Sequence, residues 1–387
     1  MIPIAKPLLG EEEAAAARRA ILSGWVTQGP EVAAFEQEFA IATGAAHACA
    51  VSSCTTALHV ALLACDVDPG DEVITVSHSF IATANAIRYC GAIPVFVDVA
   101  LETFNIDPSA IEAAVTSRTR AIVAVHQLGM PCDLAAVTTI AALHGLRVIE
   151  DAACAIGSEI RWDGPGPAAG TGEWQRIGRP HGDVACFSFH PRKLLSTGDG
   201  GMLTTHDAAL DARFRLLRQH GMSVPDTVRH TSSQVIAETY PVLGFNYRMT
   251  DIQAAIGREQ LKRLPAIVER RRLLAQRYRD GLSGAAGIEL PGEPAWARSN
   301  WQTFAVRVER SRQRAIMQRL LDAGIATRRG VMNAHREAAY PAGTWRAAGS
   351  LARSEQAQDT AIALPLFHAL SETDQDRVIA MLREAAG

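Results

Sequence analysis

The stretch from Asp183 to Thr205 reads DVACFSFHPRKLLSTGDGGMLTT. Its first apolar run ends at Ser188 and a second begins behind a cluster of glycines, so the pattern predicts two strands joined by a turn. Lys193 lies on that turn and is the only lysine between Lys6 and Lys262. A lysine on such a turn, with small hydroxyl residues before it, is typical of a desolvated amine that forms a Schiff base. A solvent-facing loop lysine is the alternative.

A second candidate is Asp151, upstream of the lysine turn. The run from Arg147 to Glu150 predicts a short buried strand, and Asp151 follows at its carboxyl end. The next residues, Ala152 and Ala153, are small and leave room for a flat ligand. An aspartate in this setting suits the partner of a pyridinium nitrogen, because its charge keeps the ring protonated and able to accept electrons. The alternative is an aspartate that caps a following helix.

Three motifs follow one another along the chain: IEDAACAIGS at 149–158, SFHPRKLLSTGDGGML at 188–203 and GFNYRMTDIQAAIGREQL at 244–261. Together they resemble the sugar aminotransferases of the DegT/DnrJ/EryC1/StrS family, which are pyridoxal 5'-phosphate (PLP) enzymes with the fold of aspartate aminotransferase. The resemblance extends from KPLLGEEE near the start to LPLFHALSETDQDRVI near the end. It implies an α/β protein of PLP fold type I, in which a large domain with a mostly parallel, seven-stranded type of sheet covered by helices precedes a smaller C-terminal α+β domain.

The pattern of the 387 residues agrees with this organisation. From His47 short apolar strands alternate with helical segments that we expect to begin near Ser79, Pro108 and Asp133, which favours a mostly parallel sheet covered on both faces. We assign residues 1–265 to the large PLP-binding domain and 266–387 to the small domain. The segment GFNYRMTDIQAAIGREQLKRL should lead into a long helix that Pro265 kinks or divides. The glycine- and proline-rich residues 161–182 are expected to form an inserted loop.

The turn from Ser52 to Thr56 follows a predicted strand and opens a helix. Free N–H groups and the positive end of the helix dipole make such a junction either an anion site or an ordinary N-cap. The resemblance implies that this turn holds the cofactor phosphate through Cys54, Thr55 and Thr56, with Cys54 where the family usually has glycine.

The resemblance also assigns roles to single residues elsewhere. Ser188 and Asn246 match further phosphate contacts, and Asn246 is expected to reach the site from the other subunit of a homodimer. Phe80 matches the aromatic residue that stacks on the cofactor ring, although a single Phe in that position also suits the core. Cys154 occupies a position that is usually His or Gln.

The substrate residues are predicted from two further segments and the lysine turn. The loop after the first helix supplies Trp25 and Gln28. In the family the matching loop lies near the substrate; the alternative is a helix connection in which Trp25 only packs. In the C-terminal part, the segment IATRRGVMNAHREAAYP has local basic character that suits a nucleotide diphosphate, or is a solvated loop. The substrate candidates are therefore Trp25, Gln28, His190, Arg328, Arg329 and His335, with Arg336 beside them.

Charge and cysteine content restrict the partners. The net charge of −3 and the pI of about 6.5 give no electrostatic case for nucleic acid or an anionic membrane. The seven cysteines are scattered through apolar runs with no ligand spacing, which predicts reduced thiols and no metal site. No run approaches the roughly 18 apolar residues of a membrane span, so we expect a cytoplasmic protein.

The resemblance implies that PLP is held on Lys193 and that an amino group moves, with glutamate as donor, to a nucleotide-linked keto-deoxysugar, with a 4-keto-6-deoxyhexose favoured. Lys193 argues against a PLP-fold dehydratase, because in that relative His replaces the lysine. Two alternatives stay open: an aminotransferase acting on a cyclitol or other cyclic ketone, and a non-catalytic PLP-binding regulator.

Overall fold

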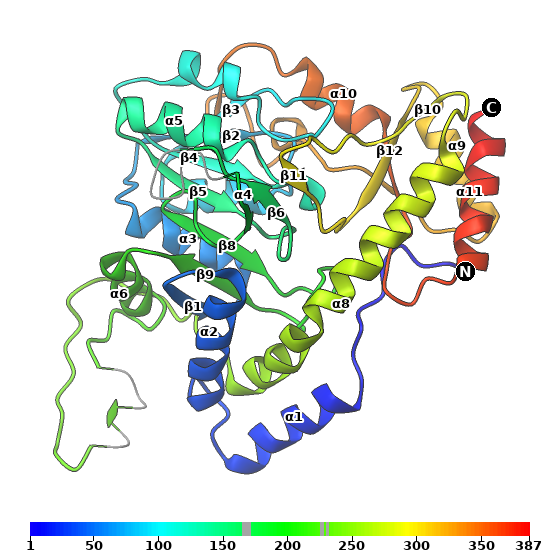
Figure 1. Ribbon diagram of the computed structural model, residues 1–387. Coiled ribbons are helices and arrows are strands. Elements are labelled where there is room, and N and C mark those ends of the chain that lie inside the picture. Colours follow the sequence, from blue (N-terminus) through cyan, green and yellow to red (C-terminus); the bar gives the residue numbers. More distant parts are fainter. Residues whose placement is uncertain (165–171, 225–227, 230–231) are drawn as a thin grey trace.

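The computed structural model describes residues 1–164, 172–224, 228–229 and 232–387. An eight-stranded sheet forms its centre, in the order β1-β9-β8-β5-β4-β2-β3-β14 (Figure 1). The strands are β1 (His47–Val51), β2 (Glu72–Val76), β3 (Ile93–Val97), β4 (Thr119–Val125), β5 (Arg147–Asp151), β8 (Val184–Ser188), β9 (Gly201–Thr205) and β14 (Arg346–Ala347).

The sheet is mostly parallel, as the sequence predicted. Strand β9 pairs antiparallel with β1 and β8, and the other neighbours pair parallel. The two-residue β14 adds an eighth strand to the expected seven. Because all strands except β9 share one direction, their carboxyl ends meet at one edge, which is where ligands bind in such sheets.

Helices cover both faces of the sheet, and the strands are mostly apolar because both faces are buried. In β1, Ala48 and Ala50 join one core while Cys49 and Val51 join the other. The first core includes side chains of α2 (Pro30–Thr43) and α5 (Leu134–His144). The second includes side chains of α3 (Cys54–Ala64), α4 (Ala82–Tyr89) and α6 (Ala208–Leu217).

Two local predictions were wrong. The helix expected near Pro108 is only a pair of 3-10 turns, Pro108–Ala110 and Glu112–Ala114, because the backbone becomes extended at Val115, before β4 begins at Thr119. The expected loop at 161–182 contains β7 (Trp174–Arg176), which pairs antiparallel with β6 (Glu159–Arg161). Strands of three residues are too short to produce a readable period. Residues 165–171 of that segment lie outside the described residues.

Helix α8 (Asp251–Leu282) links the two parts of the chain. It extends from α1 (Glu11–Ser23) and α2 toward the C-terminal sheet (Figure 1). The helix continues through Pro265, so the proline does not divide it. The predicted domain boundary at residue 265 therefore lies inside one helix, and the division into 1–265 and 266–387 stays a prediction.

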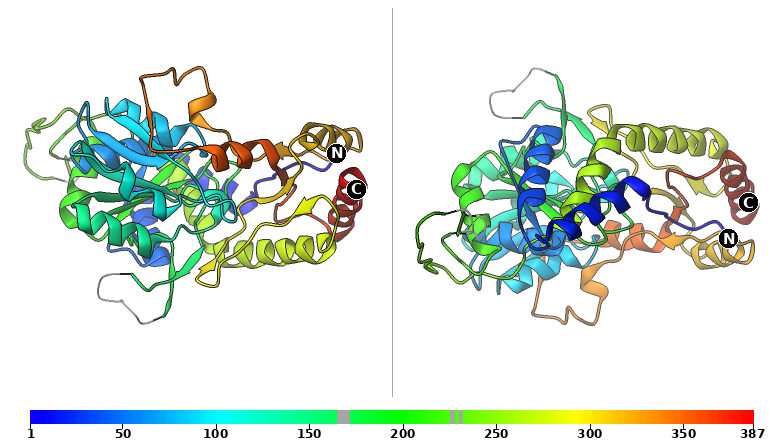
Figure 2. Two further views of the ribbon diagram at one scale, coloured as in Figure 1. Left: turned by 90° about the horizontal axis from the view of Figure 1, so that it is seen from above. Right: turned by 90° about the horizontal axis from the view of Figure 1, so that it is seen from below.

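The C-terminal part is built on an antiparallel sheet in the order β10-β12-β15-β13. Ile2 pairs with Ile325, and both termini lie at this end of the molecule (Figure 2). Among the described residues, no helix is long and apolar enough to cross a membrane. The elements here are β10 (Ile288–Glu289), β11 (Ala297–Arg298, which pairs with β6), β12 (Phe304–Val308), α9 (Gln313–Asp322), β13 (Arg328–Arg329), the 3-10 turn Ala334–Arg336, α10 (Ala352–Thr360), β15 (Ala361–Leu364) and α11 (Glu372–Ala386).

Candidate active site

Lys193 lies on the turn that joins β8 to β9, as the sequence predicted. Its backbone N–H donates to His190 O at 2.8 Å, and its amine lies 3.0 Å from Cys154 Sγ. Burial acts to lower the pKa of this amine, but the nearby Cys154 and Asp151 outweigh burial and raise the pKa above 10.5. Without a ligand the amine is therefore held as an ammonium in a pocket that contains a carboxylate.

Asp151 is buried at the carboxyl end of β5. Its Oδ2 accepts a hydrogen bond of 2.7 Å from Thr83 Oγ1, and its Oδ1 accepts one of 3.2 Å from Ala153 N. Thr83 is held in turn by a 2.8 Å contact with Ser79 Oγ. Thr83 was not predicted from the sequence: a hydroxyl in the first turn of a helix at this sheet edge marks a candidate donor, but not its partner 68 residues away.

The predicted phosphate turn is the start of α3. Ser53 caps the helix by accepting from Thr56 N, and Thr56 Oγ1 donates to Ser53 O at 2.7 Å, so the Thr56 hydroxyl is occupied. Within the described part of the chain, neither the Thr55 hydroxyl nor the N–H groups of Cys54 and Thr55 have a hydrogen-bond partner. These donors lie at the positive end of the helix, which makes an anion site.

Gly201 allows β9 to pass directly beneath this turn. A Cβ atom at Gly201 would overlap the carbonyl of Ser53 and the nitrogen of Cys54. Cys54 is itself buried, and burial raises the pKa of its thiol well above the usual value. The thiol is therefore neutral, and the helix start is free to carry positive potential alone.

Phe80 and Ser188 complete the candidate cofactor surface. Phe80 lies between β2 and α4, and its side chain is 67% exposed, which is unusual for an aromatic residue beside a buried carboxylate. Ser188 ends β8, and its Oγ accepts from His190 N at 3.4 Å. The ring of Phe80 thus offers a flat apolar surface close to Asp151 in the fold, since Thr83 in the next helical turn contacts that aspartate.

Asn246 lies on an extended segment next to the phosphate turn. Ser52 N donates to Tyr247 O at 2.8 Å, and Arg248 pairs with Val51. Asn246 is exposed, and its Oδ1 accepts from Arg248 Nε at 3.2 Å. The side chain is therefore at the molecular surface rather than packed inside its own chain.

The two loop candidates Trp25 and Gln28 contact each other. Trp25 Nε1 donates to Gln28 O at 3.0 Å, over Gly29, where a Cβ atom would overlap the indole. Asp251 fixes this loop by accepting from Gly29 N at 2.7 Å and Val32 N at 3.0 Å. Gln28 Oε1 is buried and has no hydrogen-bond partner among the described residues, so it is available to a ligand donor.

The four basic candidates of the C-terminal part divide into two pairs. His335 and Arg336 are occupied: His335 contacts Ser77 Oγ at 2.7 Å, and both side chains contact Glu355. Arg328 and Arg329 form β13 at the edge of the small sheet and are exposed. Neighbouring strand residues point to opposite faces, so the two arginines do not act together. Arg329 lies 3.8 Å from Glu337, and Arg328 has no ion pair in the described residues.

His190 is half-buried, and its Nδ1 accepts from Arg192 N at 3.2 Å. Burial and the nearby Arg192 and Lys193 lower the pKa of its imidazole, with Asp199 opposing them. The ring is therefore neutral at pH 7. Within the described residues, no group of three or more His, Cys, Asp or Glu is placed to hold a metal ion.

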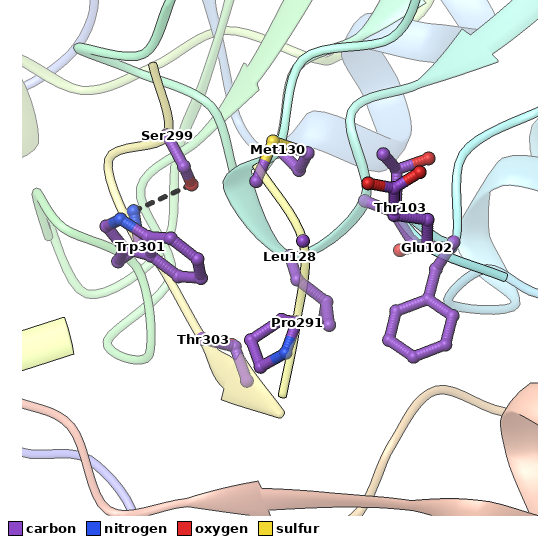
Figure 3. A pocket seen from close by; sticks show the side chains of 11 residues that line it. Glu102, Thr103, Leu128, Met130, Pro291, Ser299, Trp301 and Thr303 are labelled. Atoms are coloured by element: carbon purple, nitrogen blue, oxygen red, sulfur yellow. Dashed lines mark hydrogen bonds between the residues drawn. The ribbon is translucent and has the colours of Figure 1, made fainter. Parts of the chain in front are cut away.

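A separate small pocket lies where the large sheet's loops meet the C-terminal part, between Thr103, Leu128 and Trp301 (Figure 3). Its volume is about 20 Å³, which accommodates roughly one water molecule. It is too small for a cofactor or a sugar. Within it Trp301 N donates to Ser299 Oγ at 2.9 Å.

The site has the parts that PLP needs: an amine at Lys193, a buried carboxylate at Asp151, an exposed aromatic ring at Phe80 and free N–H donors at the start of α3. A fold of this type with these groups defines a PLP-dependent aminotransferase of fold type I.

Comparison with known proteins agrees with this class. Residues 7–383 match the model of the DegT/DnrJ/EryC1/StrS aminotransferase family. DesV from S. venezuelae, solved in complex with a ketimine intermediate, is 37% identical, with a TM-score of 0.86 over 97% of this chain and 94% of that chain. The PLP form of a putative sugar aminotransferase, Spr1654 from Streptococcus pneumoniae, is 26% identical, with a TM-score of 0.89 over 100% and 98%. The structure of 3-amino-5-hydroxybenzoic acid (AHBA) synthase is 28% identical, with a TM-score of 0.87 over 100% and 98%.

The chain belongs to the DegT/DnrJ/EryC1/StrS aminotransferase family. The cofactor of this family is PLP. The predictions of family, fold, enzyme class and cofactor made from the sequence are therefore confirmed. The roles of the individual site residues stay predictions.

Proposed function

We propose that this aminotransferase moves an amino group from glutamate to a nucleotide-linked keto-deoxysugar, with a 4-keto-6-deoxyhexose as the favoured acceptor. The observation that carries the proposal is Arg328, a cation that is exposed and has no ion pair among the described residues. A nucleotide sugar brings an anionic diphosphate, which requires a cation beyond those that bind the cofactor phosphate. The segment after Arg329 packs onto the loop that carries Phe80, since Ala334 N donates to Ser77 O at 2.9 Å.

When bound, PLP supplies an electron sink that stabilises negative charge on the donor's α-carbon. Lys193 is the group that would move the proton: its amine would take a proton from the donor's α-carbon and return one at the C4′ carbon of the cofactor. Asp151, held by Thr83, keeps negative charge next to the ring nitrogen. The N–H groups of Cys54 and Thr55 and the Thr55 hydroxyl bind the phosphate.

A cyclic ketone that carries no nucleotide is the second candidate acceptor. The likeness to AHBA synthase favours it, and such a substrate needs no diphosphate site. A panel assay separates the two candidates: purified enzyme, PLP and glutamate are incubated with nucleotide-linked 3-keto and 4-keto sugars and with free cyclic ketones. NMR of the product then locates the new amine. Amination of nucleotide sugars is the expected result, and turnover of free ketones alone would refute the proposed acceptor.

We further propose a homodimer with shared active sites. The segment leading to Asn246 carries apolar side chains that are strongly exposed in one chain, among them Val235 and Leu243, at 102% and 87% exposure. Exposed apolar side chains in a row indicate a surface that a partner covers. Asn246 is exposed at the end of this segment, in position to contact a second copy.

The seven cysteines are all free thiols, which suits a reducing cytoplasm.

A further inference from the structure

The contact between Lys193 and Cys154 joins two segments that follow neighbouring strands of the sheet. Lys193 Nζ lies 3.0 Å from Cys154 Sγ, and this is the one side-chain hydrogen bond of the amine in the described chain. Cys154 is half-buried and comes three residues after Asp151. The Asp151 carboxylate accepts from Ala153 N, and this local turn directs the thiol toward the lysine.

One loop of the C-terminal part holds the backbone on both sides of this contact. Asn300 is fully buried, and its Nδ2 donates to Cys154 O at 2.8 Å. Two residues further on, Gln302 Nε2 donates to Arg192 O at 2.5 Å, directly before the lysine. The spacing between the thiol and the amine is therefore fixed by side chains from a single short loop.

That loop is fixed in its turn. Asn300 Oδ1 accepts from Gln302 N at 2.8 Å, and Gly129 leaves the space that the Asn300 side chain fills. The buried Arg271 of α8 donates from Nε to Trp301 O at 2.9 Å and from Nη2 to Gln302 O at 2.5 Å. In the described residues both hydrogen bonds of this buried cation go to backbone carbonyls, and such a cation is costly to retain. Its effect here is to hold the loop that positions Cys154 and Lys193.

We propose that Cys154 is a positioning residue for the reaction: its thiol is the resting partner of the Lys193 amine whenever that amine is not joined to the cofactor. The amine must leave the cofactor in every half-reaction in order to move protons. A fixed acceptor at hydrogen-bond distance keeps the long lysine side chain in one rotamer during that interval. Less rotamer entropy is then lost when the amine next reacts. Simple filling of space by Cys154 is the competing explanation.

The test uses the fact that the only lysines of the chain are Lys6, Lys193 and Lys262. Cofactor-stripped protein is treated with a trace of acetic anhydride, and mass spectrometry gives the ratio of acetylated Lys193 to acetylated Lys262. Lys262 has a 63% exposed side chain and serves as the reference in each sample. Because Cys154 helps to raise the pKa of Lys193, its removal leaves more neutral amine at a given pH.

We expect the ratio to rise at least about threefold at pH 8 in Cys154→Ala. Cys154→Ser keeps an acceptor and should stay near the wild type. Cys90→Ala removes a buried thiol elsewhere and is the control. An unchanged ratio in Cys154→Ala would overturn the proposal. So would a serine variant that shifts as far as the alanine variant, because a hydroxyl acceptor at this position would then have no effect on the amine.

A second measurement follows the enzyme at work. With PLP and glutamate in a single half-reaction, Cys154→Ala should lower the maximal rate at least about threefold while the apparent KM for glutamate stays the same. Loss of positioning slows the proton transfer by Lys193 and does not change the binding of glutamate before that transfer. A half-reaction as fast as that of wild type would contradict a positioning role even if the labelling ratio had changed.

Discussion

Thr83 donates a hydrogen bond of 2.7 Å to Oδ2 of Asp151, and this bond joins the first turn of α4 to the end of β5. The hydroxyl therefore links the helix that follows Phe80 to the carboxylate that is expected to face the cofactor ring. It fixes the orientation of the carboxylate in a buried site where rotation would otherwise leave an oxygen without a partner.

The Thr83 bond should matter for rate. A hydrogen bond to a charged group contributes about 1.5 to 3 kcal/mol, so Thr83→Val is expected to lower kcat roughly 10- to 100-fold. Thr83→Ser keeps the hydroxyl and is the matched control. Asp151→Asn should bind PLP and lose more rate than Thr83→Val, because the anion itself is gone. Steady-state kinetics with absorbance of the bound cofactor measures both, and a Thr83→Val enzyme with wild-type kcat would contradict this role.

Lys193 should carry the cofactor. Lys193→Ala is expected to lose turnover and the visible absorbance of bound PLP while its circular dichroism stays native. Lys262→Ala, at an exposed position paired with Glu259, should behave as wild type. Borohydride reduction followed by peptide mapping locates the attachment. A reduced PLP adduct at any other lysine, or none at Lys193, would refute the assignment.

The proposed homodimer with shared active sites predicts rescue between two inactive variants. Lys193→Ala and Asn246→Ala homodimers should each be nearly inactive, and mixing them under conditions that exchange subunits should restore part of the activity. One hybrid site then combines an intact lysine with Asn246 from the partner. If Asn246 serves its own chain, the hybrid has no intact site and no activity returns. An active monomer in sedimentation would also rule out sharing.

Arg328 and Arg329 provide a matched pair on one strand. Arg328→Ala should raise KM for the nucleotide sugar at least about tenfold, the value of one charge-assisted contact, and leave KM for glutamate unchanged. Arg329→Ala should have a smaller effect, because its side chain points to the other face and lies near Glu337. Equal, wild-type constants in both variants would show that β13 does not bind the diphosphate.

A buried ion network predicts how stability depends on pH. Glu36 accepts from Ala50 N at 2.9 Å and from Arg215 at 2.8 Å, and it also pairs with Arg218. Burial acts to raise the pKa of Glu36, but Arg218 and Arg215 outweigh burial, so the pKa is lowered below 4.5. The stability that this carboxylate contributes is present above about pH 4.5 and is lost as the pH falls through the folded-state pKa.

Glu36→Gln should therefore cost about 3 to 5 kcal/mol at pH 7, because it leaves the buried Arg218 without a charge partner. The difference from wild type should shrink below pH 4.5, where the wild type loses the same charge. Urea unfolding across this range measures it. Glu384→Gln removes an exposed pair with Arg319 and should cost less than about 1 kcal/mol. A constant difference at all pH values would contradict the assignment.

Site residues could be predicted from the sequence where the pattern that marks them lies within a few neighbouring residues. Asp151 is marked by the strand before it and the small residues after it, and Lys193 by the strand and the hydroxyl residue before it, so their positions followed from short motifs. The partners Thr83, Asn300 and Gln302 were not found, because each makes its contact across at least 68 residues, as Thr83 does with Asp151. Only the folded chain reveals which distant side chain fills such a place.

For the basic segment of the C-terminal part, the sequence suggested more available positive charge than the structure leaves. His335 and Arg336 counted as free charges in the sequence, although Glu355 and Asp359 of α10 pair with them. Those carboxylates come about twenty residues later, beyond the reach of any helical spacing rule. Local composition therefore overestimated the positive charge that remains available to a ligand.

Helix α8 connects the C-terminal sheet to the candidate active site. Its 32 residues give it a length of about 48 Å at 1.5 Å per residue, and Pro265 removes one hydrogen bond near its middle. A bend of about 10° at that point would displace the far end by roughly 4 Å and Arg271 by roughly 1.5 Å. Because Arg271 holds the loop that fixes Cys154 and Lys193, a substrate that tilts the C-terminal part would also shift the lysine relative to its neighbours. A tilt of the C-terminal part would therefore change the position of the Lys193 amine.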